Sequence, residues 1–460
     1  MPPPRRRRRG LLVTAGVVIA ALAISGGAYA VVSSGGGDNA DAAIDELPST
    51  AVAAGWVSLH PGGGQEKAAL HTLHQLDASI SESGSIKDNV LSQVLDNAGQ
   101  DYDKDIKPWL GDHAGVAAIP QDGDLTTVGA IQVTDKDKAE AFLKNRSENE
   151  GFSGEYQFDG DYAIVGESKD IVQQAIKDIH AGNLSKNDAY NTAIKGLDGK
   201  AMGMFWADAK AMKPFAEKQG TNLPPWTPTS MALSFTFQDN YLDVQVSIKG
   251  GPKIASDNMG ARIAKLPGDT TTAIGATGLD KGVKQLAQIM QESPAGARLA
   301  GPLSSLSYRT GIEDSDQLAT LLGSRTILTT GPGLSTIGFI SKSDDPDQTK
   351  EELDGLAQNI SGGLDFTTKQ TDEGTIFASS PGYADKLAAK DGDLGSQEGY
   401  RTAVPDAADA NVVIYANLDA YSQIGGQDMP KQLKNYRSFG LTCTFGSDGT
   451  THARMRLVTK

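Results

Sequence analysis

The chain is poor in cysteine, with Cys443 as the single example among 460 residues. One thiol excludes an intramolecular disulfide, and the absence of a cysteine near the N-terminus excludes a lipid-modified N-terminal cysteine as an anchor. A chain of this length buries enough apolar surface to fold without covalent cross-links. We therefore expect two or three folded units held together by packing alone.

Acidic residues are missing from residues 1–32, which contain instead the arginine run Arg5 to Arg9. The whole chain has 42 Lys and Arg against 57 Asp and Glu, a formal net charge of −15. The part after residue 32 is therefore more acidic still, and it repels nucleic acid and anionic lipid head groups. We expect no nucleic-acid partner. The acidity indicates a soluble surface, with cations or basic partners as the alternative.

The N-terminal region contains one long apolar segment. Residues 11–32 carry no charge, and at 1.5 Å per residue they can cross a hydrocarbon core of about 30 Å as one transmembrane helix. Arginines before it predict a basic cytoplasmic tail over residues 1–10, and a Gly-rich tether comes next over residues 33–44. The alternative is a signal peptide cleaved after Ala30, since Ala28-Tyr29-Ala30 fits a cleavage site. Both interpretations place the body outside the cytoplasm.

The second half of the chain repeats the first. Leu47-Pro48 opens one copy and Leu266-Pro267 opens the other. Further matches occur in the same order: Gly111 with Gly323, Tyr190 with Tyr400, Trp206 with Tyr415, and the turn Asp239-Asn240 with Ser447-Asp448-Gly449. Collinear matches of this kind predict a duplication, with copies over residues 45–250 and 262–460.

Each copy mixes two hydrophobic periods. Leu70, Leu73 and Leu76 have helical spacing, whereas Met231 to Phe237 alternate as in a strand. The patterns predict an α+β fold in which each copy is an antiparallel sheet with helices on one face. Cys443 alternates with two apolar neighbours on a predicted strand, so we expect it to point into the core and to be inert.

Two groups of residues have spacings that suggest a metal. Asp101, Asp103 and Asp105 alternate as in a calcium loop, but Ile106 replaces the turn glycine that such a loop needs, so we expect a helix cap instead. The histidines at positions 60, 71 and 74 could share zinc, but no carboxylate or thiol completes the set. We expect them to lie on a solvated helix face.

Recognised catalytic motifs are missing. Ser256-Asp257-Asn258 has neither a Ser-x-x-Lys nor a Lys-Thr-Gly to accompany it, and Gly331-Pro332-Gly333 has no P-loop lysine after it. His113 has no Ser or Cys partner at a recognised spacing. The sequence therefore predicts no catalytic, cofactor-binding or metal-ligating residue, no cofactor, and a protein that is not an enzyme.

Several segments resemble a known family. They are the arginine-tailed anchor, the opening Leu-Pro, and residues Asp101–Gly111, Asp159–Val165 and Phe205–Asp208. With these segments, most of the chain resembles the domain of unknown function 3352 family. The resemblance implies a membrane-anchored protein of the bacterial envelope, and it implies no activity.

The function expected from these observations is a non-enzymatic binding or scaffold module of the cell envelope, with an unidentified partner or ligand. The alternatives are an envelope hydrolase and a carrier of an apolar ligand held between helix and sheet. A deep cleft with converging polar groups would favour the hydrolase, a large apolar cavity the carrier, and a flat exposed apolar patch the binding module.

Overall fold

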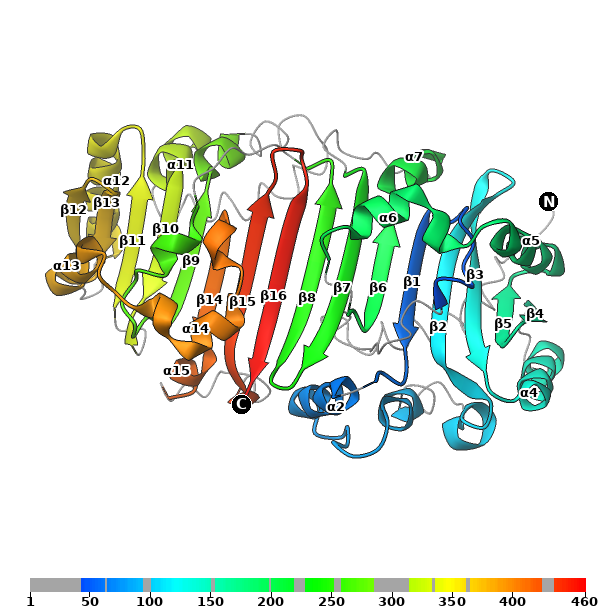
Figure 1. Ribbon diagram of the computed structural model, residues 1–460. Helices are drawn as coiled ribbons and strands as arrows, with labels where there is room; N and C mark the ends of the chain where they lie inside the picture. Colours follow the sequence, from blue (N-terminus) through cyan, green and yellow to red (C-terminus); the bar gives the residue numbers. More distant parts are fainter. Residues whose placement is uncertain are drawn as a thin grey trace, which may run out of the picture. The chain divides into compact units, whose positions relative to one another are not determined.

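The chain folds into two units, the first ending at Gly251 and the second beginning at Pro252 (Figure 1). A computed structural model describes residues 43–62, 64–93, 101–149, 154–197, 200–218, 228–251, 258–284, 314–332, 336–360, 365–423 and 434–460. Within these ranges no helix is long and apolar enough to cross a membrane. The predicted tail, the predicted anchor and nearly all of the predicted tether lie outside the described residues.

The described part of unit 1 is an antiparallel sheet with helices. Its strands are β1 (Ala53–Ser58), β2 (Leu110–Gln121), β3 (Asp124–Val133), β4 (Glu155–Asp159), β5 (Tyr162–Gly166), β6 (Gly203–Ala207), β7 (Ser230–Gln238) and β8 (Tyr241–Lys249). Its helices are α2 (Gln65–Leu76), α4 (Lys136–Asn149), α5 (Lys169–Ala181), α6 (Asp188–Ile194) and α7 (Ala209–Lys218), with short turns at Lys87–Leu91, Tyr102–Ile106 and Leu184–Lys186. Across the sheet the order is β4-β5-β3-β2-β1-β6-β7-β8.

Unit 2 has the same construction. Its strands are β9 (Thr272–Thr277), β10 (Arg325–Thr330), β11 (Ile337–Lys342), β12 (Thr367–Thr371), β13 (Gly374–Ala378), β14 (Val412–Asn417), β15 (Tyr436–Phe445) and β16 (Thr451–Thr459). Its helices are α8 (Gly260–Ile263), α11 (Ser315–Leu322), α12 (Pro346–Ile360), α13 (Pro381–Ala389), α14 (Glu398–Ala403) and α15 (Leu418–Gln423), with short turns at Leu394–Ser396 and Ala407–Asp409.

The strand order confirms the predicted repeat. In unit 2 the order is β12-β13-β11-β10-β9-β14-β15-β16, which is the order of unit 1 with each strand replaced by the one eight places later in the chain. Neighbouring strands are antiparallel in both units. The chain is therefore an α+β protein made of two copies of one topology.

An aromatic pair occupies the same place in both cores. Trp206 is 3% exposed and meets Tyr190 edge-on, with ring centroids 5.6 Å apart. Tyr415 is 2% exposed and meets Tyr400 edge-on at 5.2 Å. Trp206 and Tyr415 also have equivalent partners across the sheet, on β1 and β9 respectively. These contacts confirm the sequence matches between the four residues.

Equivalent helices begin with the same serine cap. The Ser168 hydroxyl accepts a hydrogen bond from a backbone N–H at the start of α5, and Ser380 does the same for α13. Pro381 occupies the first turn of α13, where its missing N–H costs nothing. The shared caps give the register in which α5 and α13 correspond.

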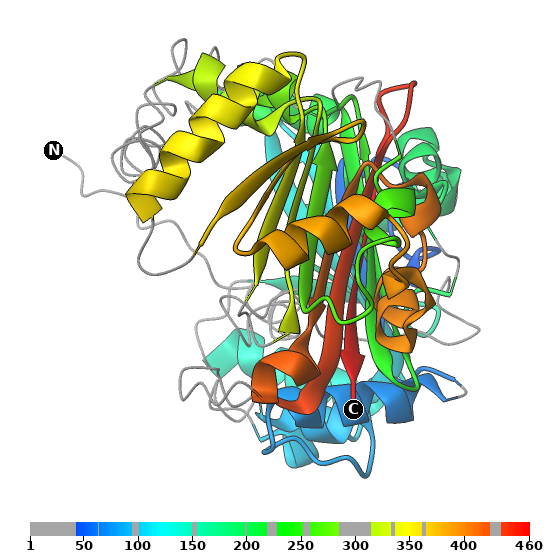
Figure 2. The ribbon, with the colours of Figure 1, turned by 90° about the vertical axis from the view of Figure 1, so that its left-hand side faces the viewer.

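Helices cover both faces of the unit 2 sheet, so the prediction of helices on one face is wrong there. Phe377 of β13 packs in a cluster with Leu353 of α12. The next residue, Ala378, points to the opposite face, where its partner Gly338 approaches Leu387 of α13. Figure 2 shows α12 and α13 on opposite sides of β13. A strand with consecutive apolar residues buries both faces and needs cover on each.

Strand β15 faces the other way from the sequence-based expectation. Its buried positions include Ser438, Gly440 and Thr442, whereas Leu441 and Cys443 are only half-buried. At Gly440 a Cβ atom would lie 2.2 Å from a backbone oxygen at the end of α14, so the helix packs directly on the small residues. The expectation that the apolar residues of β15 face the helices was therefore wrong, and the buried face is the one formed by their neighbours in the sequence.

We predict that Trp206→Ala lowers the free energy of unfolding by about 3–5 kcal/mol, because a buried ring leaves a cavity when it is removed. Phe205→Ala is the matched control, since Phe205 is the neighbouring residue of the same strand and is 39% exposed. Its loss is expected to be clearly smaller. Urea denaturation of the full chain, followed by circular dichroism, measures both, and equal losses would contradict the shared aromatic core.

Candidate functional site

The three histidines of the predicted helix face have separate partners. His60 Nδ1 lies 3.1 Å from Glu66, and His71 Nδ1 lies 3.1 Å from Glu82. His74 Nδ1 lies 2.7 Å from a backbone carbonyl oxygen. Within the described ranges no three His, Cys, Asp or Glu side chains converge as a metal site would require.

The aspartates with calcium-like spacing have a structural role. The Asp101 carboxylate accepts a hydrogen bond from the Lys104 backbone N–H at 3.1 Å, which caps the turn Tyr102–Ile106. Asp103 forms an ion pair with Lys107 at 3.1 Å. The capping role predicted from the sequence is confirmed.

The remaining candidates from the sequence, namely the segments 256–258 and 331–333 and His113, do not form a common site among the described residues. Residues 256, 257 and 333 lie outside the described residues. His113 lies on β2 and is buried, and that burial lowers the pKa of its imidazole. Asn258 is different from these, because it reaches the rim of a cavity in unit 2.

That cavity has a volume of about 440 Å³, within the range of about 300–1,000 Å³ that is usual for small-molecule sites. We call it the cationic pocket. Its apolar lining consists of Ala261, Leu266, Ile327, Ile340 and Leu387. Its charged lining consists of Arg262, Lys265, Arg325, Lys390 and Glu373. Four cations and one carboxylate thus meet beside an apolar wall formed by α8, β10, β11 and α13.

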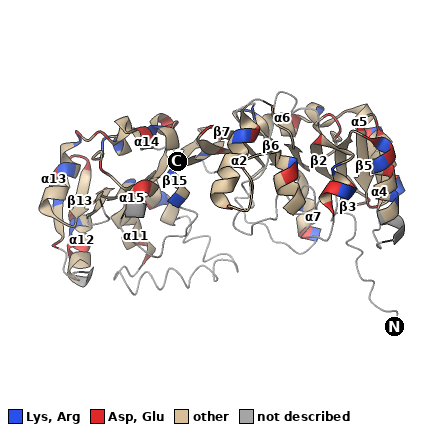
Figure 3. Cartoon of the chain, turned by 90° about the horizontal axis from the view of Figure 1, so that it is seen from below, with Lys and Arg blue, Asp and Glu red and all other residues tan. Residues whose placement is uncertain are grey.

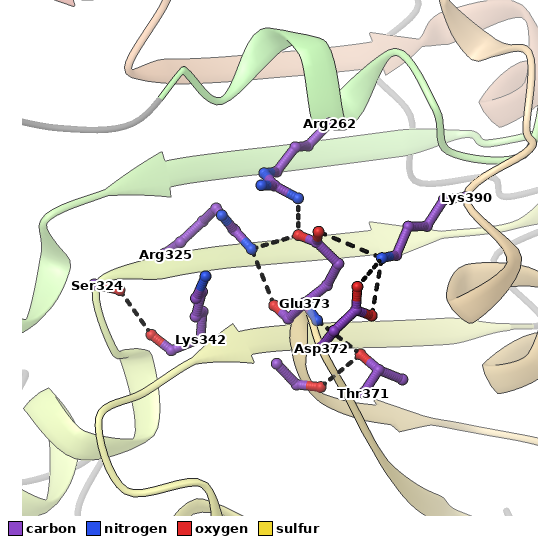
Figure 4. A network of polar contacts seen from close by, with 9 residues as sticks. Arg262, Ser324, Arg325, Lys342, Thr371, Asp372, Glu373 and Lys390 are labelled. Atoms are coloured by element: carbon purple, nitrogen blue, oxygen red, sulfur yellow. Dashed lines mark hydrogen bonds and ion pairs between the residues drawn. The ribbon is translucent and has the colours of Figure 1, made fainter.

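Three of the four cations converge on the carboxylate of Glu373 (Figure 4). Arg325 Nη2 donates to Glu373 Oε2 at 2.6 Å and to the Glu373 backbone oxygen at 3.0 Å. Lys390 Nζ lies 3.3 Å from Glu373 Oε1, and Arg262 forms an ion pair with Oε2. Charge-assisted contacts of this kind are the strong hydrogen bonds of proteins.

A second carboxylate, that of Asp372, pairs with Lys390. Lys390 donates to both oxygens of Asp372 at 2.9 Å, and these hydrogen bonds keep the pKa of Asp372 below its usual value. Even with Asp372 counted, the described residues of the pocket include four cations and two carboxylates, so together they carry excess positive charge. Elsewhere, as on the surface of helix α5, positively and negatively charged side chains alternate (Figure 3).

The fold places these side chains by tight backbone packing. Glu373 lies in the turn between β12 and β13, and the next residue, Gly374, has φ +128. A Cβ atom on Gly374 would lie 2.2 Å from the Ser341 backbone oxygen, so only glycine fits. Arg325 opens β10 with a side chain 3% exposed, which fixes its guanidinium under the turn.

The register of the strands shows that Arg325 corresponds to His113 of unit 1. Gly115 of β2 and Ile327 of β10 have equivalent partners on β1 and β9. Two residues before them on each strand lie His113 and Arg325. A buried histidine of the first copy is therefore a buried arginine in the second.

Arg262 and Lys265 also lack a cationic counterpart in unit 1. The leucines of the two opening Leu-Pro pairs are equivalent, because each backbone carbonyl accepts a hydrogen bond from the leucine that opens the next short turn. Counting back from these leucines, unit 1 has Ala43 and Glu46 where unit 2 has Arg262 and Lys265. Arg262, Lys265 and Arg325 are thus cations of the second copy alone.

Comparisons with known proteins identify the chain. A family model described as "Protein of unknown function (DUF3352)" matches residues 12–157 and 147–378. The chain belongs to this family. No curated protein matches it.

Solved structures that are similar over part of the chain are crystal forms of TP0453. Form I has 8% identity and a TM-score of 0.26, with 46% of this chain and 81% of that chain covered. Form III has 9% identity and a TM-score of 0.25, with 48% and 85% covered.

Neither the residues shared by the two copies nor any known motif reveals the cationic pocket. The signal that could have found it is a difference: three positions at which the second copy has a cation and the first does not. The described lining residues include no Ser, Thr, Cys, His or Tyr, so they offer donors to an anion and no such nucleophile.

We predict slow alkylation of Cys443 at neutral pH, although its side chain is half-buried rather than enclosed. Burial raises the pKa of its thiol to about 11, so the reactive thiolate is scarce at pH 7 and its fraction rises about tenfold per pH unit up to that value. The rate of iodoacetamide labelling between pH 7 and pH 11 measures this. A rate that levels off near pH 9 would contradict the raised pKa.

Proposed function

We propose that the chain is a non-enzymatic binding module, tethered to the membrane and facing away from the cytoplasm, whose second unit binds a small organic anion. The observation that carries the proposal is the cationic pocket of unit 2, which is lined by four cations. The positions equivalent to two of them, Arg262 and Arg325, are occupied in unit 1 by Ala43 and His113. The first unit then serves as scaffold.

The charge pattern supports an anionic ligand. The chain as a whole is acidic, with a formal net charge of −15, yet this one cavity carries more cations than carboxylates. A concave site lined by one sign of charge concentrates ions of the opposite sign. The apolar wall beside it favours an organic ligand over an inorganic ion.

The two alternative functions find less support in the pocket. A carrier of a purely apolar ligand would leave the cations covered and poorly solvated, which is costly. A hydrolase needs a nucleophile or a water-activating base in the cleft. Among the described lining residues the acidic side chain is Glu373, and its carboxylate is already paired with three cations.

The membrane location rests on the N-terminal sequence. An arginine run precedes the uncharged residues 11–32, the arrangement that keeps the N-terminus in the cytoplasm and exports the rest of the chain. The proposed ligand is then an anion available at the outer side of the membrane.

We predict that the chain stays with membranes after a high-salt wash and that its N-terminus is at or near Met1. Neutral residues in place of Arg5 to Arg9 should scramble its orientation, while five lysines should preserve it because they keep the charge. Fractionation, N-terminal sequencing and protease accessibility measure these outcomes. A soluble chain that begins at Val31 would contradict the anchor.

A second prediction addresses the ligand. For the full-length chain in lipid nanodiscs, octanoate and octyl phosphate should raise the melting temperature, whereas octanol and octyltrimethylammonium should not. At a concentration one hundred times the Kd the expected stabilisation is about 2.7 kcal/mol.

The double variant Arg262→Ala/Lys265→Ala should lose this response, and the control Lys213→Ala, at an exposed position of α7, should keep it. Equal effects of the cationic and anionic probes, or no effect of either acid, would refute the proposed function.

A further inference from the structure

We infer that Glu373 occupies the position of the ligand's acidic group, and that the ligand is a carboxylic acid with an apolar body that displaces this side chain. The inference rests on the proposed function and specifies its ligand. Three features of the cationic pocket support it: the donors around Glu373, the contacts that remain when its side chain leaves, and the wall next to it.

The donors around Glu373 already form a receptor for a carboxylate. Arg325 donates at 2.6 Å to one oxygen, Lys390 lies 3.3 Å from the other, and Arg262 pairs with the first. A planar guanidinium matches the geometry of carboxylate and phosphate groups, and the group that it meets in this structure is a carboxylate. A carboxylate from a ligand would meet the same donors in the same place.

Two of these donors, Arg325 and Lys390, have contacts that remain without the Glu373 side chain. Arg325 also donates to the backbone oxygen of Glu373 at 3.0 Å, and Lys390 donates to both oxygens of Asp372 at 2.9 Å. Neither contact involves the Glu373 carboxylate. Arg325 and Lys390 are thus held ready for an incoming anion, which limits the entropy that binding must overcome.

Glu373 itself is placed where it can leave. It lies in the turn that joins β12, the last strand in the order of the unit 2 sheet, to β13. Its side chain is 25% exposed, whereas that of Arg325 beneath it is 3% exposed. Rotation of the Glu373 side chain toward solvent therefore uncovers a buried cation without moving a strand.

The apolar wall selects among acids. Leu266, Ile327, Ile340 and Leu387 line the same cavity as the cations. Glu373 is tethered next to its donors, so its effective concentration there is high and a bare small acid competes poorly. An acid with an alkyl body gains apolar burial on the wall in addition, and this gain lets it displace Glu373.

The test removes Glu373 and supplies its carboxylate from solution. For the full-length variant Glu373→Ala in nanodiscs, acetate should raise the melting temperature in a saturable way. Wild type should show no such response, because Glu373 fills the position. Glu398→Ala, which removes an exposed glutamate ion-paired with Arg437, is the matched control and should behave as wild type.

The isosteric variant Glu373→Gln keeps the size of the side chain, so it covers the case in which the alanine variant fails to fold. It should bind octanoate on the order of tenfold more tightly than wild type does, as read from the concentration dependence of the melting temperature. Octyl phosphate is measured in parallel on the same samples.

The outcomes separate the two claims. One set of results refutes this inference and leaves the proposed function standing: octanoate stabilises wild type, acetate has no effect on Glu373→Ala, and Glu373→Gln binds octanoate no more tightly than wild type does. If octanoate and octyl phosphate stabilise none of the proteins, both fail. Tighter binding of octyl phosphate than of octanoate to Glu373→Gln would assign the position to a phosphate and overturn the carboxylate.

Discussion

Each unit depends on the double pairing of its first strand. β1 pairs with β2 on one side and with β6 on the other, and β9 pairs in the same way with β10 and β14. These contacts join segments far apart in the chain, and they set the register of every strand outside them. The cationic pocket inherits that register, because the pairing of β9 with β10 decides which face Arg325 points to.

Within this shared topology the two copies differ in which of two contacting core residues is the larger, the one on the strand or the one on the helix. Unit 1 places Val128 and Ala175 in one core cluster. At the corresponding positions unit 2 has Gly338 and Leu387, and a Cβ atom on Gly338 would lie 2.5 Å from Leu387 Cδ1. Large and small residues have changed places between strand and helix, which keeps the core filled. A duplicated scaffold can therefore keep its topology while one copy acquires a different lining.

The sequence predicts the topology well, but it predicts less well which face of a strand is buried. Hydrophobic periods, turns and the collinear repeat predicted an antiparallel α+β unit present twice, and the matched aromatics Trp206 and Tyr415 are buried in both. Alternation in β15 predicted a face but could not identify it, because the helix packs on Gly440 and Ser438 rather than on the apolar set. A period-two pattern says which residues share a face, and tertiary packing decides which face is covered.

The cationic pocket could not be predicted from hydrophobic periods or motifs, since its charged residues lie in or next to α8, β10 and α13 and in one turn, and none of them belongs to a recognised pattern. No local spacing connects Arg262 with Arg325 or Lys390. The pairing of β9 with β10 and the packing of α8 and α13 against the sheet bring them together. The sequence did contain a contrast between the copies. His113 against Arg325 and Ala43 against Arg262 stand out only when the repeat is aligned and searched for differences in charge.

The energetics of the pocket are consistent with the proposed binding role, because its charges do little for stability. Burying a guanidinium costs several kcal/mol of desolvation, and an ion pair rarely returns more than that. Arg325 is 3% exposed and shares Glu373 with two further cations, which repel it. Unit 1 folds in the same topology with a neutral alanine at one of these positions. A cluster that the fold does not need, and that exists despite electrostatic repulsion, has its natural compensation in an anion that enters from outside.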